Sequence, residues 1–163
     1  MLKKVRLTIA TERVSAAGSL FADGGVKTLC APEMPRREVT AAEGNYLDDG
    51  GRVSVTYKED EGSGLAGSRA TISFFKNAPD TITVRRDGSV RTALTFKERT
   101  RCEGVYETPM MRFEVCVYTE KVVNAIEQNG TLTLDYVSEL KGAEPERTRL
   151  TVAIDPAAQP KKA

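Results

Sequence analysis

Histidine and tryptophan are absent from the 163 residues, and aromatic residues make up only 6% of them. Without histidine there is no Ser-His-Asp or Cys-His catalytic pair, no H-E-x-x-H zinc motif and no imidazole proton relay. Carboxylates, lysine, arginine, tyrosine and thiols remain for chemistry, and no constellation of them is typical of a catalytic site. The sequence therefore predicts no catalytic residues, and an enzyme is disfavoured.

Cysteine is scarce, and its three positions, Cys30, Cys102 and Cys116, lie far apart with no C-x-x-C pair. An odd number of isolated cysteines favours reduced thiols over a disulfide framework or a zinc site. The acidic run Glu59-Asp60-Glu61 offers too few oxygens for a hard cation. We expect no metal and no cofactor.

Long apolar runs are also missing, because no stretch approaches the roughly 18 residues of a membrane-spanning helix. The charged start of the chain is not followed by an apolar segment, so no secretory signal is predicted. With the reduced cysteines, these features predict a cytoplasmic protein that has no membrane contact.

An excess of one charge is lacking too, since Lys plus Arg number 24 and Asp plus Glu number 23. Binding to phosphate backbones normally needs a basic surface, so no nucleic-acid partner is expected. The hydrophobic content of 40% and charged content of 29% are ordinary for a soluble globular chain. We expect one domain over residues 1–155 and a disordered tail over residues 156–163.

What the sequence does contain is alternation of apolar and polar residues, the pattern of half-buried antiparallel strands. It recurs in Arg52–Tyr57, Thr81–Val84, Met111–Val117, Thr131–Tyr136 and Arg149–Ile154. The whole chain gives roughly ten short strands joined in order. We predict an all-β fold, a single antiparallel up-and-down β-barrel of roughly 8–10 strands, because closure removes both exposed edges.

Turn signals separate these strands at residues 48–51, 77–80 and 86–89. The Asp87-Gly88 pair suits a two-residue hairpin, and residues 16–35 suggest a long loop or a poorly formed hairpin. One segment, Thr119–Asn129, has Val122, Val123 and Ile126 at helical spacing. We predict a short helix or helical turn there, with Thr119 as N-cap and Gly130 as terminator.

The stretch Gly62–Gly67 reads GSGLAG and fits the dinucleotide-binding pattern G-x-G-x-x-G. That motif requires a helix after the glycines to receive the pyrophosphate. Here the β-forming segment Ser68–Phe75 follows, and the acidic run before the glycines would repel phosphate. We interpret the glycines as a flexible hairpin connection.

The same region carries a family resemblance that continues in order along the chain. The matching stretches are Glu43–Tyr46, Tyr57–Gly67, Val84–Gly88, Tyr106–Pro109, Thr119 and Gly130–Tyr136. Together they resemble the YwiB-like family of small bacterial proteins of unknown function. The resemblance implies a calycin-like, lipocalin-related barrel and supplies no activity. Met110-Met111 stands where the family usually has an aromatic residue followed by glycine.

Strand parity singles out one group of side chains. Glu59 shares a face with Val53, Val55 and Tyr57, and Arg86 shares a face with Ile82 and Val84. In an up-and-down meander these two strands run in the same direction, so Glu59 and Arg86 point inward at one mouth of the barrel.

Two tyrosines are expected at the same mouth, because the strands that end near Tyr106 and Tyr136 also run toward it. The candidate ligand-binding residues are therefore the charged pair and three phenols: Glu59, Arg86, Tyr57, Tyr106 and Tyr136.

Two interpretations of this mouth stay open. As a polar plug, the ion pair closes the barrel and the protein is a non-enzymatic interaction or assembly module with a filled interior. As an anchor, Arg86 holds a small amphipathic or acidic ligand whose tail lies in the barrel. Interior volume distinguishes the two. An unsealed strand edge would favour a homodimer.

Overall fold

The computed structural model describes residues 2–21, 25–28, 35–59 and 68–155. Antiparallel strands account for most of this part of the chain. The elements are β1 (Leu2–Ser19), β2 (Gly25–Thr28), β3 (Arg36–Asp48), β4 (Arg52–Lys58), β5 (Arg69–Phe75), β6 (Ala78–Asp87), β7 (Thr92–Phe96), β8 (Thr100–Glu107), β9 (Arg112–Ala125), α1 (Ile126–Asn129), β10 (Thr131–Leu140) and β11 (Glu146–Asp155).

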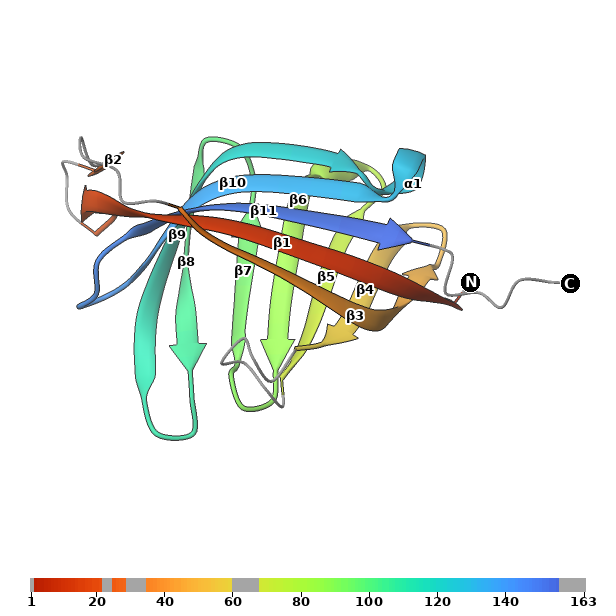
Figure 1. Cartoon of the computed structure of the whole chain (residues 1–163), viewed down its shortest axis with the longest axis horizontal. Coiled ribbons are helices and arrows are strands. Elements are labelled where there is room, and N and C mark those ends of the chain that lie inside the picture. The colour runs from red at the N-terminus through yellow and green to blue at the C-terminus, as the bar shows by residue number, and fades with distance from the viewer. Residues whose placement is uncertain (1, 22–24, 29–34, 60–67, 156–163) are drawn as a thin grey trace, which may run out of the picture.

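The strands form one up-and-down barrel, which confirms the predicted fold class. Their order is β7-β6-β5-β4-β3-β1-β11-β10-β9-β8. Most strands therefore pair with their neighbours in the chain; the exceptions are that β1 meets β11, that β2 is passed over, and that β7 and β8 stand at the two ends of the order. The short β2 pairs only with the last residues of β1, away from the barrel body (Figure 1).

The two ends of this strand order, β7 and β8, meet along a seam that is only partly hydrogen-bonded. The described residues provide one bridge there, in which the amides of Arg91 and Glu107 each donate to the other's carbonyl at 2.8 and 2.9 Å. Gly104 lies beside this seam, where a Cβ would come within 3.2 Å of the Ala93 carbonyl oxygen. The barrel is therefore nearly closed, with one weakly paired junction.

The interior is a single apolar core built from alternate residues of the strands. Val53, Val55 and Tyr57 of β4 are buried, whereas their neighbours Ser54 and Thr56 are partly exposed. The same alternation places Leu7, Ile72 and Leu132 among the side chains with at most 2% exposure. The alternation of apolar and polar residues in the sequence thus predicts correctly which side chains of these strands face the core.

The helix predicted over Thr119–Asn129 is mostly wrong. Strand β9 continues to Ala125, Thr119 is a buried strand residue, and α1 is a single turn over Ile126–Asn129. Gly130 does end that turn, with a left-handed φ of 78°. The misleading spacing comes from a β-bulge in β9. Asp135 pairs with Lys121 and Tyr136 pairs with Thr119, which leaves Glu120 as an extra residue without a partner position in β10. Before the bulge the inward-facing residues of β9 have odd numbers, and after it they have even numbers.

The turn signals in the sequence mark the right places, with two differences of detail. The Asp87-Gly88 pair does not form a two-residue hairpin, because the last β6–β7 pair is Arg86 with Thr92. The turn between β5 and β6 contains Lys76 and Asn77, and Pro79 already lies in β6. Within residues 16–35, the described part is a short hairpin in which Ala16–Ser19 pairs with Gly25–Thr28.

The glycine stretch at residues 62–67 and the tail after residue 155 lie outside the described residues. The segment that follows the glycines is the strand β5, as the sequence suggested, so the helix that a dinucleotide-binding turn requires is not present at Arg69–Phe75. Among the described residues, no helix has the length and apolar character needed to cross a membrane.

Candidate functional site

Glu59 and Arg86 form an ion pair at one mouth of the barrel, as strand parity predicted. The Arg86 Nε donates a hydrogen bond to Glu59 Oε1 at 2.9 Å. The Glu59 side chain is 9% exposed and that of Arg86 is 24% exposed. The pair is thus largely withdrawn from water, with the guanidinium on its wetter side.

A small cavity of about 80 Å³ lies beside this pair. Seven strands or their ends contribute its lining, which mixes apolar residues with two arginines, two glutamates and two phenols. The lining residues are Ile9, Thr11, Arg13, Glu38, Thr40, Tyr57, Glu59, Ile72, Val84, Arg86, Tyr136 and Leu150. The described mouth is therefore polar at its rim, apolar below, and narrow.

Two of the three predicted tyrosines line this cavity. Tyr57 is 6% exposed, and Tyr136 stacks at a tilt on Phe96 with ring centroids 4.8 Å apart. Tyr106 packs against the same apolar core but is not among the residues that line the cavity. The structure therefore brings together Glu59, Arg86, Tyr57 and Tyr136, and leaves Tyr106 to one side.

Burial and charge act against each other at Arg86. Burial by itself lowers the pKa of the guanidinium, but the Glu59 carboxylate, both through its charge and as a hydrogen-bond acceptor, outweighs that effect and holds the pKa above its ordinary range. Arg86 is therefore always charged at this mouth. Such a group can neutralise a buried carboxylate or hold an anion, and no proton transfer is available from it.

Sequence reasoning missed two charged residues of the mouth, Arg13 and Glu38. Arg13 occupies the same inward parity as Leu7 and Ile9 on β1, and Glu38 that of Ala42 on β3. That parity was a usable signal, but β1 and β3 are not among the strands that clear alternation predicts. Arg13 also lies 3.8 Å from Glu146 across the β1–β11 pair.

The phenol of Tyr57 gives a testable pH dependence. Burial, followed by the nearby Glu59 charge, raises the pKa of Tyr57 to about 12. An unfolded tyrosine titrates near pH 10, so the folded state holds this proton longer and stability falls as pH rises from about 10 to 12.

We expect Tyr57→Phe to lessen this alkaline loss of unfolding free energy by about 2 kcal/mol. Urea unfolding of both proteins at a series of pH values checks this, with the change across pH compared instead of the absolute stability. Tyr106→Phe, away from the cavity, is the control. Identical pH profiles for wild type and Tyr57→Phe would contradict the assignment.

The carboxylates and thiols of the described part of the chain bear on metal and thiol chemistry. No group of three or more Cys, Asp or Glu side chains there has the arrangement of a metal site. Cys102 and Cys116 are free thiols. Burial raises the pKa of the Cys116 thiol even though the Arg101 Nε lies 3.1 Å from its sulfur, and a raised pKa makes a thiol less reactive.

Comparison with known proteins agrees with this architecture. A family model described as "Domain of unknown function (DUF1934)" matches residues 36–152. The chain belongs to this family. A crystal structure of the ywiB protein from Bacillus subtilis is similar, with a TM-score of 0.64 and 16% identity, over 93% of this chain and 92% of that chain. No curated protein matches at a significant level.

Membership in this family confirms the YwiB-like resemblance seen in the sequence and supports the barrel fold. Glu59 and Arg86 both lie inside the matched span. Since the family is described as one of unknown function, any role for the mouth has to come from its geometry.

Proposed function

We propose that this protein is a non-enzymatic interaction module whose barrel is filled and whose outer surface does the binding. The observation that carries this proposal is the size of the mouth cavity, about 80 Å³. Sites for drug-sized ligands measure roughly 300–1,000 Å³. The Glu59–Arg86 pair then acts as a polar plug over the apolar core.

The outer surface supports this interpretation through its hollows. Two hollows of about 570 and 550 Å³ are open to solvent, one where β3 and β4 diverge and one over β1 and β9–β11. Pockets on a protein surface can receive the anchoring side chains of a partner. The large exposed apolar side chains, among them Met110 at 91%, Phe75 at 59% and Val39 at 56%, lie on separate elements, which is ordinary for a protein surface.

A second candidate is binding of a small anion at the mouth. Arg86 keeps about a quarter of its side chain exposed there, and Arg13 lines the same cavity. Arginine recognises carboxylate and phosphate groups through paired N–H donors. Because the cavity leaves no room for an apolar tail, the ligand would be a small carboxylate or phosphate.

Native mass spectrometry of protein purified from its host cells separates the two candidates. The filled-barrel proposal expects the apo mass for wild type under gentle ionisation. A small molecule retained by wild type and lost in Arg86→Ala would overturn it and favour the anion site. Arg85→Ala serves as the control, since Arg85 points outward from the neighbouring position and is 65% exposed.

A further inference from the structure

On the outer face of β3, β1 and β11, six charged residues form two rows that cross the strands, and Lys4 and Arg147 lie outside these rows. In the first row, Glu12 pairs in register with Arg37 on one side and Arg149 on the other. In the second row, Arg6 pairs in register with Glu43 and Asp155. The signs alternate within each row, and each strand carries opposite signs in its two rows.

The first row continues beyond β11. Asp135 of β10 pairs with Arg149, and Lys121 of β9 pairs with Asp135. Within the row, Arg149 Nε lies 2.8 Å from Asp135 Oδ1, and Arg37 Nε lies 4.0 Å from Glu12 Oε1. The outer face is thus ordered by side-chain charge across five neighbouring strands.

An uncharged band separates the two rows. Its six residues on these strands are small or β-branched, and all are exposed or partly exposed: Thr8, Ala10, Val39, Ala41, Thr151 and Ala153. The rows are six residues apart along each strand, roughly 20 Å at the usual rise. β1 and β11 lie side by side along the middle of this face (Figure 1).

This pattern is self-complementary under one symmetry operation. The two-fold axis runs along the uncharged band, perpendicular to the strands. Rotation about it places the first row of one copy over the second row of the other copy. Arg37 then faces Glu43 of the second copy, Glu12 faces Arg6, and Arg149 faces Asp155. An axis parallel to β1 would instead stack Glu12 on Glu12, so the charges select the first arrangement.

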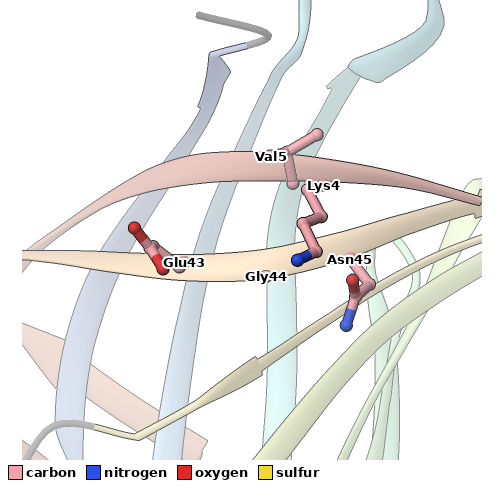
Figure 2. Close-up of a pocket in the computed structure, with 5 residues that line it drawn as sticks. All are labelled: Lys4, Val5, Glu43, Gly44 and Asn45. Atoms are coloured by element: carbon pink, nitrogen blue, oxygen red, sulfur yellow. The ribbon is translucent and has the colours of Figure 1, made fainter. Parts of the chain in front are cut away.

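We infer that a second copy of this chain docks on the β3–β1–β11 face through this axis. The small band residues allow two sheets to approach closely, with the charged rows on both sides. The hollow of about 240 Å³ around Glu43, lined also by Lys4 and Asn45 (Figure 2), and the hollow of about 550 Å³ beside Glu12 and Arg149 leave space for long side chains of the second copy.

The size of the face sets the expected affinity. Three strands by seven residues cover roughly 14 by 24 Å, which corresponds to about 700 Å² of total buried surface in a dimer. That value lies below the range of stable interfaces and corresponds to a weak, transient contact. We therefore expect a dissociation constant of about 100 μM or more that rises as salt screens the charged rows.

The inference rests on the proposed function, since it makes the outer surface the binding surface, and charge reversal tests it. Glu12→Arg places arginine over Arg6 of the second copy, and Arg6→Glu places glutamate over Glu12. Each variant alone should dimerise at least about tenfold more weakly than wild type. An equimolar mixture should form a heterodimer with nearly wild-type affinity. In it the introduced arginine of one variant faces the introduced glutamate of the other, and the native Arg6 faces the native Glu12.

Sedimentation velocity of wild type, both variants and their mixture measures these affinities. Arg85→Glu reverses a charge on β6, outside this face, and should dimerise like wild type. Wild type that stays monomeric up to about millimolar concentration overturns the inference, as do single variants that dimerise normally or a mixture that stays monomeric. If wild type is monomeric, the dimer is ruled out but the proposed function is not. If a ligand is retained in the barrel, the proposed function is ruled out but the dimer is not.

Discussion

Replacing Arg86 with alanine is expected to lower the free energy of unfolding by about 3 kcal/mol, because Glu59 stays buried without a partner. Breaking a buried ion pair from one side typically costs about 3–5 kcal/mol. The lower end applies here because Arg86 is 24% exposed and water reaches its side of the pair. Urea unfolding at neutral pH measures the loss.

Two control variants isolate the cause. Arg85→Ala, at the adjacent outward position, breaks the exposed pair with Asp87 and should cost less than about 1 kcal/mol. Arg86→Met combined with Glu59→Leu removes both charges and should lie within about 1 kcal/mol of wild type, because apolar replacement of a whole buried pair is often neutral. An Arg86→Ala variant as stable as Arg85→Ala would show that the mouth is fully hydrated.

Gly44→Ala is expected to destabilise the barrel by about 3 kcal/mol through a steric clash. A Cβ at this position would lie 2.4 Å from the Thr56 carbonyl oxygen and 2.7 Å from Leu7 Cδ1. Thr56 is held by strand pairing on both sides, and Leu7 is fully buried. The Thr56 carbonyl cannot move without separating strands, so the backbone of β3 has to shift even where the Leu7 side chain rotates away.

Gly51→Ala is the matched control for this substitution. The nearest atom to a Cβ there is Asp49 Oδ1 at 3.9 Å, so the change should alter stability by less than about 1 kcal/mol. Thermal unfolding of both variants beside wild type gives the comparison. Equal melting temperatures for Gly44→Ala and wild type would mean that β3 and β4 separate more readily than their pairing suggests.

The Glu59–Arg86 pair could be predicted from the sequence because it depends on two simple rules. Side chains alternate along a strand, and strands two apart in an antiparallel meander run in the same direction. Both rules hold where Tyr57 pairs with Ala70 and Ala70 with Arg86, because the register irregularity of the β5–β6 pair lies at its other end, between Ser73 and Phe75. In the structure the two side chains do meet, with 2.9 Å between Arg86 Nε and Glu59 Oε1.

The prediction of a helix at Thr119 was wrong because the alternation rule that predicts the ion pair does not hold across β9. Parity is reliable only while the ladder is unbroken, and the extra residue Glu120 in β9 breaks it. A bulge places successive inward residues three apart, here Thr119 and Val122, which is also helical spacing. Local sequence does not reveal a bulge, since it depends on the partner strand.

The two charged rows lay beyond sequence reasoning for a related cause. Glu12, Arg149 and Arg37 belong to segments far apart in the chain, and only the β1–β11 and β1–β3 registers align them. A register shift of a single residue would turn the row inward. Long-range pairing is what converts scattered charges into a pattern.

The pairing of β1 with β11 also determines when the barrel can close during synthesis. Every other barrel contact joins strands that follow one another closely, so they can pair as the ribosome releases them. β1 has to wait for Glu146–Asp155, more than a hundred residues later. Until then one edge of β1 and the outer edge of the growing sheet stay unpaired. During this interval the nascent chain is most exposed to aggregation and most in need of a chaperone, because unpaired strand edges can pair with other chains.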